Sequence, residues 1–219
     1  MADKAMIAED IVRAALGHVP FDGWSMATLA LAADDCGLDE AALDQHFPRG
    51  VQDAIVLYAA IADCDMVEAF NALDEAPTKT HLKIRALILC RLSLAIPHKE
   101  TVSKTLSYLA QPQHAAMASK LLYQTSDVMW RAAGDDATDF SFYSKRATLA
   151  GVYSATLLAF LADDSADMAK TEAFLDRRLA DIAQIPKVTA PAKAVFSKAA
   201  SLAGGLVSGL ASGKMRGRK

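Results

Sequence analysis

The sequence GWSMATLALAADDCGLDEAALDQHFPRGV occupies residues 23–51 and decides the fold. Ser25 is suited to begin a helix, because its hydroxyl accepts a hydrogen bond from a free N–H group of the first turn. Apolar residues then recur at helical spacing up to Gly37, and glycine is typical of the position just after a helix. A short helix ending at His46 and a long helix from residue 51 follow. This order and spacing predict a helix-turn-helix unit.

The remaining sequence continues the helical pattern on both sides of this unit. Hydrophobic residues make up 53% of the chain, and no run of alternating β-branched residues indicates a strand. Apolar periodicity predicts further helices over residues 5–18, 51–73, 80–95, 97–110, 112–131, 140–161 and 168–184. We therefore expect an all-α protein in three parts: a helix-turn-helix-like subdomain (1–50), a helical body (51–185), and a linker with a C-terminal tail (186–219).

A helix-turn-helix unit suggests DNA binding, but the charge of this one argues against it. No Lys or Arg lies between Arg13 and Arg49. Affinity for DNA depends on cations that neutralise phosphates. The acidic residues in or beside the unit are Asp22, Asp34, Asp35, Asp39, Glu40 and Asp44. We therefore expect no nucleic-acid partner and interpret the motif as a mark of the fold.

The C-terminal tail has the opposite charge. The formal net charge is −3, and seven Lys or Arg residues but no acidic residue follow Asp181, so the rest of the chain carries about −10. At helical spacing the tail gathers an apolar face that includes Val195, Phe196, Leu202, Leu206, Val207 and Leu210. An apolar face beside basic residues is typical of helices that lie in the headgroup region of anionic membranes. The alternatives are a frayed tail and a helix packed on its own body.

The residue types that carry catalysis or bind metals show no recognised spacing. The five histidines are scattered without an HExxH or ExxH pair, and no P-loop, GxGxxG or GxSxG motif occurs. The acidic turn at residues 135–139 does not match a calcium loop. We therefore expect no enzymatic activity, no metal and no cofactor other than a bound lipid.

Location is predicted from what the sequence lacks. The N-terminus has no apolar signal core, and no stretch of 18 uncharged apolar residues suggests a membrane-spanning helix. The widely spaced cysteines (Cys36, Cys64 and Cys90) are interpreted as core residues in a reducing compartment. We expect a cytoplasmic protein that lies peripherally on the inner face of the plasma membrane.

A second stretch, residues 127–153 (DVMWRAAGDDATDFSFYSKRATLAGVY), places an acidic, aromatic and basic entrance before an apolar helix. Its most specific features are Trp130, AGD at 133–135, TDF at 138–140, Tyr143 and Arg146. With these features the chain resembles the Coq-nine family, the ninth protein of coenzyme Q (ubiquinone) biosynthesis, over nearly its whole length. The N-terminal unit also resembles that of tetracycline-repressor-type regulators.

The resemblance implies a tetracycline-repressor-like fold without a known DNA role. It implies a hydrophobic cavity in the body that binds lipid or an isoprenoid quinone intermediate, a membrane-binding C-terminal helix, and a partner in the hydroxylase that acts on demethoxyubiquinone. Carried over by the motif, the partner surface comprises Asp127, Met129, Asp139, Phe142, Tyr143 and Arg146. Phe142 stands where animal members of the family have Trp.

Candidate cavity residues come from the helices expected to be buried, and each of them also suits a plain core position. They are Leu87, Cys90, Leu94, Leu106, Met117, Leu121, Met129, Tyr153 and Leu157. A homodimer is expected, since this fold commonly pairs through the last two body helices and the small residues Ala147, Gly151 and Ala155 allow close helix approach. A ligand-sensing regulator and a general lipid-transfer protein are the alternative functions.

The tail prediction is tested by deletion of residues 187–219. The shortened protein should lose co-sedimentation with anionic liposomes, because the apolar face and the seven basic residues are removed together. Circular dichroism should show that the helical body is retained. Undiminished liposome binding by the shortened protein would contradict the assignment.

Overall fold

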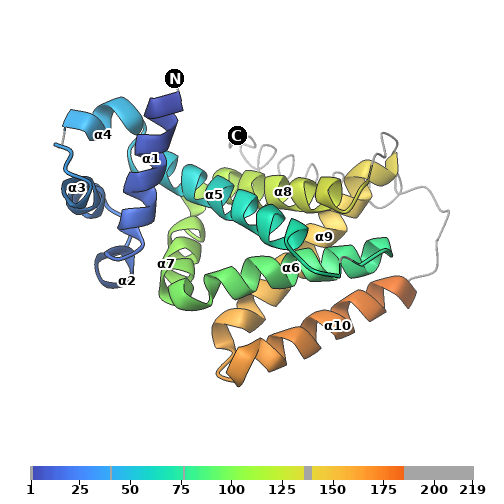
Figure 1. The fold of residues 1–219 in the computed structure, drawn as a ribbon. Helices are drawn as coiled ribbons and strands as arrows, with labels where there is room; N and C mark the ends of the chain where they lie inside the picture. Colours follow the sequence, from blue (N-terminus) through green and yellow to red (C-terminus); the bar gives the residue numbers. More distant parts are fainter. Residues whose placement is uncertain (1, 40, 76, 136–139, 185–219) are drawn as a thin grey trace, which may run out of the picture. The chain divides into compact units, whose positions relative to one another are not determined.

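A computed structural model of the chain describes residues 2–39, 41–75, 77–135 and 140–184 (Figure 1). Its helices are α1 (Ala2–Ala15), α2 (Val19–Asp22), α3 (Met26–Asp35), α4 (Ala41–His46), α5 (Val51–Asn71), α6 (Thr80–Ala95), α7 (Lys99–Leu109), α8 (Ala115–Ala132), α9 (Phe140–Ala162) and α10 (Ala169–Gln184), with single 3-10 turns η1 (Ile96–His98), η2 (Pro112–His114) and η3 (Ala166–Met168). The all-α prediction is confirmed. None of the helices in these ranges is both long enough and apolar enough to cross a membrane.

The chain divides into two compact units, Met1–Asp181 and Ile182–Lys219. The first unit contains both the predicted N-terminal subdomain and nearly all of the predicted body. The predicted membrane-binding residues (Val195, Phe196, Leu202, Leu206, Val207 and Leu210) lie outside the described residues, as does Asp139.

The helix-turn-helix unit forms through the local signals in its sequence. Ser25 caps α3 by accepting a hydrogen bond from the Thr28 N–H at 3.0 Å. Gly37 follows α3 with a φ of +71°, and the next N–H, of Leu38, donates back to the Ala33 carbonyl at 2.9 Å. Glycine meets this left-handed turn without the steric cost that a side chain would add. The turn therefore separates α3 from α4 as the sequence predicts.

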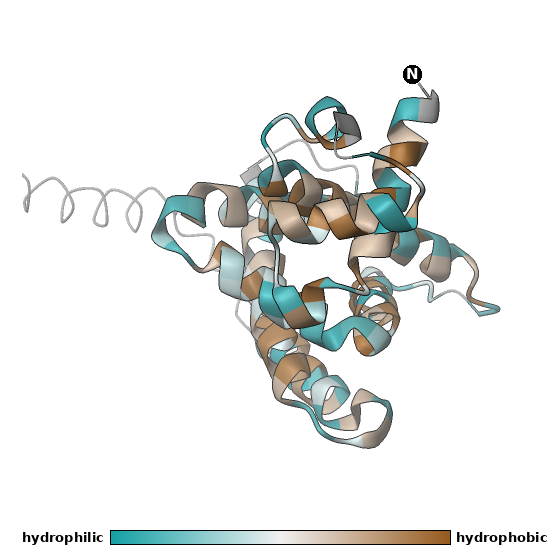
Figure 2. Ribbon diagram, turned by 90° about the vertical axis from the view of Figure 1, so that its left-hand side faces the viewer, coloured by the Kyte–Doolittle hydropathy of each residue, from teal (hydrophilic) through white to brown (hydrophobic). Residues whose placement is uncertain are grey.

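The body packs around α5 and α8. Helix α5 lies against α1, α6 and α8, and α8 lies against α9 (Figure 1). Hydrophilic and hydrophobic residues alternate along the helices in Figure 2, as expected of amphipathic helices that bury one side. The buried side chains at the centre include Leu87, Ile88 and Met129.

Helix α10 is fixed to the body at its start and at its middle. Asp163 accepts hydrogen bonds from the hydroxyls of Ser165 and Thr171 and from both of their backbone N–H groups. These donors, the Ser165 hydroxyl first, hold the pKa of Asp163 well below its ordinary value. Further along, Arg85 of α6 pairs with Glu172 and Asp176 of α10, each at 2.5 Å.

The interpretation of the cysteines as core residues is wrong for two of the three. Cys36 and Cys64 are exposed, and Cys90 is partly buried. Cys36 lies at the C-terminal end of α3, where the helix leaves the core. None of the three forms a disulfide.

Candidate functional site

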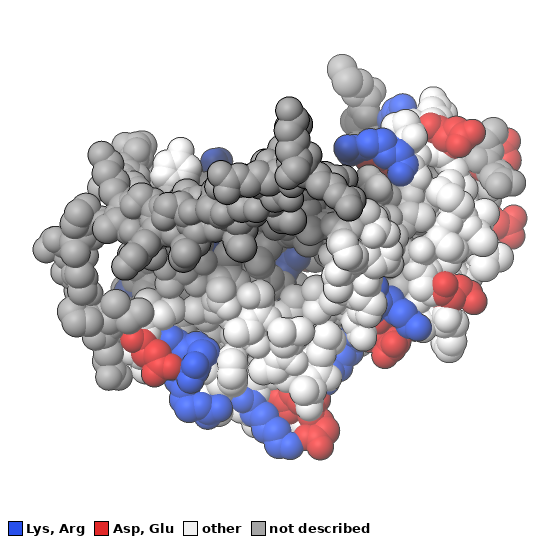
Figure 3. Space-filling model, turned by 180° about the vertical axis from the view of Figure 1, so that it is seen from behind, with Lys and Arg blue, Asp and Glu red and all other residues white. Residues whose placement is uncertain are grey.

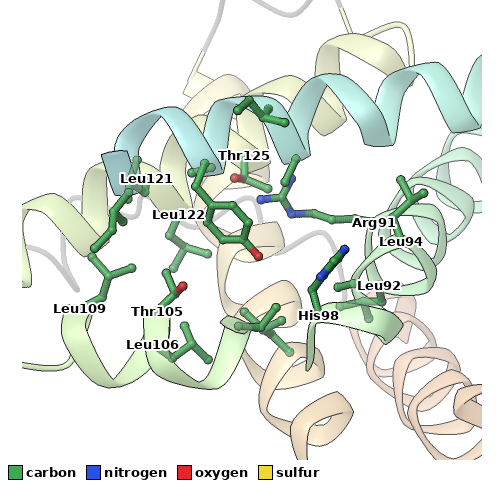
Figure 4. A pocket seen from close by; sticks show the side chains of 18 of the residues that line it. Arg91, Leu92, Leu94, His98, Thr105, Leu106, Leu109, Leu121, Leu122 and Thr125 are labelled. Carbon is green, nitrogen blue, oxygen red and sulfur yellow. The ribbon is translucent and has the colours of Figure 1, made fainter. Parts of the chain in front are cut away.

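A cavity of about 580 Å³ lies inside the helical body (Figure 4). Helices α5, α6, α7, α8 and α9 form most of its wall, and Val12, Arg13 and Leu16 close it from the N-terminal side. Its volume falls within the range of about 300–1,000 Å³ that is typical of small-molecule sites. Leucine, isoleucine, valine and alanine make up much of the lining. A site of this composition suits an apolar ligand.

Five of the predicted cavity residues line this space. They are Leu94, Leu106, Leu121, Tyr153 and Leu157. Leu106 and Leu121 belong to α7 and α8, and Figure 4 shows both side chains on the same side of the cavity. Leu94 is 45% exposed and Leu158, which also lines the cavity, is 63% exposed, so these two give the cavity an apolar rim.

The other predicted cavity residues do not line it, which corrects that assignment. Leu87 and Met129 are fully buried in the packed core. Met117 packs against the N-terminal core cluster instead. Cys90 is partly buried and is not among the residues that line the cavity, although its neighbour Arg91 is. A helix that is apolar nearly all round has no periodicity to separate its cavity face from its core face.

The sequence-based prediction missed a buried polar network at the cavity wall. Arg91 Nη1 lies 2.5 Å from Asp63 Oδ1, and Arg91 Nε donates to the Tyr153 hydroxyl at 2.7 Å. Thr125 donates to the second oxygen of Asp63 at 3.2 Å. Burial raises the pKa of Asp63, while Arg91 and Thr125 act in the opposite direction. The available signal was an arginine in the middle of the apolar run LILCRLSLA.

A second buried arginine organises the start of α9. The Arg146 side chain is only 1% exposed, and its Nε lies 2.5 Å from Asp127 Oδ1. Its Nη1 lies 3.3 Å from Asp135 Oδ2, and its guanidinium carbon lies 3.4 Å from the centre of the Phe142 ring. Lys145 also pairs with Asp135, at 2.6 Å, and together the two cations lower the pKa of that carboxyl. The described part of the entrance of α9 is thus held by a cluster of ion pairs.

Within the described residues, no group of three or more His, Cys, Asp or Glu side chains is placed to hold a metal ion. The geometry offers an apolar cavity with polar groups in its wall, and an aromatic pair at the start of α9.

Residues 115–186, which contain α8, α9 and α10, match the family model described as COQ9. The chain is 33% identical to the "Ubiquinone biosynthesis protein COQ9, mitochondrial" of Rattus norvegicus over 81% of this chain and 59% of that protein. The corresponding values for the protein of the same name from Homo sapiens are 32%, 78% and 56%. This chain is a COQ9 relative.

The comparison with solved structures agrees with the fold. A TetR transcriptional regulator from Nitrosomonas europaea superposes with a TM-score of 0.61 at 19% identity, covering 80% of this chain and 97% of the regulator. At this identity the likeness shows the TetR-like fold alone. The chain spans less than two thirds of the length of the COQ9 proteins that it matches.

The COQ9 match includes the start of α9, where the partner surface was predicted. Tyr143 is 64% exposed, and Phe142 is partly buried with its ring edge-on to Tyr143 at 5.1 Å. The Asp127 side chain is 18% exposed and is paired with both Arg146 and Arg131. Of the described candidates, Tyr143 is the one with most of its side chain accessible.

Two of the predicted contact residues require correction. Met129 is fully buried on the inner face of α8. Arg146 is enclosed by Asp127, Asp135 and the Phe142 ring, so its guanidinium has no surface to offer a partner. Its geometry assigns it a supporting position, in which it holds the Phe142–Tyr143 segment of this COQ9 relative in place.

Replacing Arg146 by Ala should lower the free energy of unfolding by about 3 kcal/mol, because removal of the buried cation leaves Asp127 and Asp135 with only their pairs to the more exposed Arg131 and Lys145. Urea unfolding followed by circular dichroism measures this loss.

Arg131→Ala is the matched control, since Arg131 also pairs with Asp127 but its side chain is 71% exposed. An exposed pair contributes about 0–1 kcal/mol. Equal losses in the two variants would refute the supporting position of Arg146.

Proposed function

We propose that this COQ9 relative is a lipid-binding accessory protein of ubiquinone biosynthesis. It holds an isoprenoid quinone intermediate in the cavity of the helical body and presents it to the hydroxylase that acts on demethoxyubiquinone. The observation that carries the proposal is the apolar cavity of about 580 Å³ with polar groups in its wall. The relatives in animals are named ubiquinone biosynthesis proteins, which supports the pathway.

The cavity chemistry suits such a ligand. Burying apolar surface contributes about 25 cal/mol per Å², so a polyprenyl chain is strongly held either by a bilayer or by an apolar protein interior. A protein that replaces the bilayer around part of the chain lowers the cost of bringing the head group to an enzyme. The leucines of α7, α8 and α9 provide this replacement (Figure 4).

The start of α9 suits a protein partner. Tyr143 follows Phe142 and contacts its ring. The Phe142 ring is fixed in turn by Arg146, whose guanidinium carbon lies 3.4 Å from the ring centre. A tyrosine on a well-fixed segment is a common hot spot of protein interfaces, because it loses little conformational entropy on binding. The hydroxylase is the proposed partner of this surface.

The remaining elements of the proposal concern location and assembly. The basic tail attaches the protein to anionic lipid on the inner face of the plasma membrane, which gives the cavity access to its ligand. Ala147 and Gly151 are exposed on α9, and such small residues suit a homodimer formed by close helix packing.

A ligand-sensing regulator is the second candidate, because the structural likeness to a TetR regulator favours it. The charge of the N-terminal unit opposes it: acidic side chains lie along the edge formed by α1 to α4 in Figure 3. A gel shift with genomic DNA at low salt separates the two candidates. We expect no shift.

The lipid part of the proposal is tested by filling the cavity. Ala118 lines it on α8, so Ala118→Trp should exclude a ligand, whereas Ala116→Trp on the exposed side of the same helix should not. Mass spectrometry should find a ubiquinone intermediate with the wild-type protein and with Ala116→Trp, and at least tenfold less with Ala118→Trp. Equal lipid in both variants, at equal helicity, would refute the cavity as the site.

The partner part is tested at Tyr143. Tyr143→Ala should weaken binding to the hydroxylase by about 2 kcal/mol, the size expected of an interface anchor. Tyr123→Ala is the control, since Tyr123 is a 38% exposed tyrosine on α8 outside the predicted surface. Surface plasmon resonance compares the affinities, and an unchanged Kd for Tyr143→Ala would exclude this surface.

A further inference from the structure

Two polar groups of the cavity, Arg91 and His98, lie on the same side of it. Arg91 and His98 extend into it from α6 and the turn η1, opposite the leucines of α7 and α8 (Figure 4). Tyr58 of α5 and Tyr153 of α9 line the same cavity, and Arg91 bonds the Tyr153 hydroxyl. The wall formed by α6 and η1 thus carries Arg91 and His98 beside Leu92 and Leu94, and the wall opposite is mainly leucine with Thr105 among them.

The charge of the polar wall is already compensated. Of the residues that line the cavity, the Lys and Arg side chains are Arg13 and Arg91. Arg91 is paired with Asp63 at 2.5 Å, and Arg13 is paired with Asp65 at 2.9 Å. An anionic head group would find no uncompensated Lys or Arg among these residues, and it would be repelled by Asp65 in the lining and by Asp63, which pairs with Arg91. At low dielectric this repulsion is large compared with its value in water.

Two polar groups that line the cavity, in contrast, remain available for hydrogen bonds to a ligand. The described part of the chain provides no hydrogen-bond partner for the Tyr58 hydroxyl or for the His98 ring. Burial raises the pKa of Tyr58 to about 12, so its hydroxyl keeps its proton at neutral pH and remains a donor.

The Tyr58 side chain is held in position by Trp24. Its ring lies 5.8 Å from the ring of Trp24, and the Trp24 indole N–H donates to Thr105 at 2.8 Å. Thr105 in turn donates to the Thr101 carbonyl at 2.7 Å. The donor is therefore held in place before any ligand arrives, which reduces the entropic cost of binding.

We propose that Tyr58, His98 and the Asp63–Arg91 pair form a head-group subsite that selects an uncharged head group with hydrogen-bond-accepting oxygens over an anionic one. Quinones, ketones and esters are of this class, whereas fatty acids and phosphatidic acid are not. This proposal rests on the proposed lipid-binding function. It adds a physical reason why the cavity would bind an uncharged ligand in preference to the anionic lipids of a membrane.

The test uses the full-length protein, freed of lipid, and two probes with the same acyl chain, one anionic and one uncharged: dodecanoate and its methyl ester. Isothermal titration calorimetry measures both affinities in wild type, Asp63→Asn and the double variant Asp63→Asn/Arg91→Met. Asp63→Asn keeps the shape of the side chain but leaves Arg91 uncompensated. It should shift the ester-to-carboxylate affinity ratio toward the carboxylate by at least about tenfold. The double variant removes the free cation and should restore the wild-type ratio.

Tyr58→Phe provides an independent measurement. It should weaken the ester and a short-chain ubiquinone by about fivefold, the effect of one hydrogen bond. An unchanged ratio in Asp63→Asn, or unchanged ester affinity in Tyr58→Phe, would overturn the subsite while leaving lipid binding intact. If neither probe nor the quinone binds the wild-type protein, the cavity is not a lipid site and both proposals fail.

Discussion

The buried pair between Asp63 and Arg91 is the interaction on which the body of this protein depends. Asp63 belongs to α5 and Arg91 to α6, and the same two side chains bond Thr125 of α8 and Tyr153 of α9. One polar network thus joins four helices that are otherwise held by non-directional apolar contacts. Desolvation of two charges is expensive, and such pairs are often no more stabilising than apolar residues of the same size. The contribution of this pair is geometric, because its hydrogen bonds are directional. It fixes how the four helices are oriented around the cavity.

A second buried arginine, Arg146, has a similar role nearer the C-terminal end of α8 and the start of α9. Arg146 draws together Asp127 near the end of α8 and Asp135 in the turn that follows. The two networks differ in what lies beside them. Arg91 borders the cavity, whereas Arg146 underlies the exposed aromatic side chain of Tyr143. Both networks therefore fix α8 against α9. The position of the polar groups in the cavity wall and the position of Tyr143 on the surface depend on this same pair of helices.

Local signals in the sequence were sufficient for the fold. Ser25 and Gly37 mark the ends of α3, and the predicted limits of the helix over residues 80–95 agree with those of α6. The cavity was only partly predictable, because Leu87 and Leu94 share one apolar helix and their different surroundings are set by distant elements. The polar network joins residues 28 to 62 positions apart in the chain, a pairing that periodicity does not reveal. Arg146 was misplaced for the same reason, since a cation near a helix start is ordinarily solvated.

The helix-turn-helix unit has a structural reason to persist without a basic surface. Val12 and Leu16 form part of the cavity wall, and Arg13 bridges from α1 to Asp65 on α5. Trp24 joins the unit to α7 through Thr105 and braces Tyr58. Removing the unit would widen the opening of the cavity and release the Tyr58 side chain in its wall. The helix-turn-helix geometry thus contributes to the wall of an apolar cavity without a cation between Arg13 and Arg49, and a fold does not by itself fix a function.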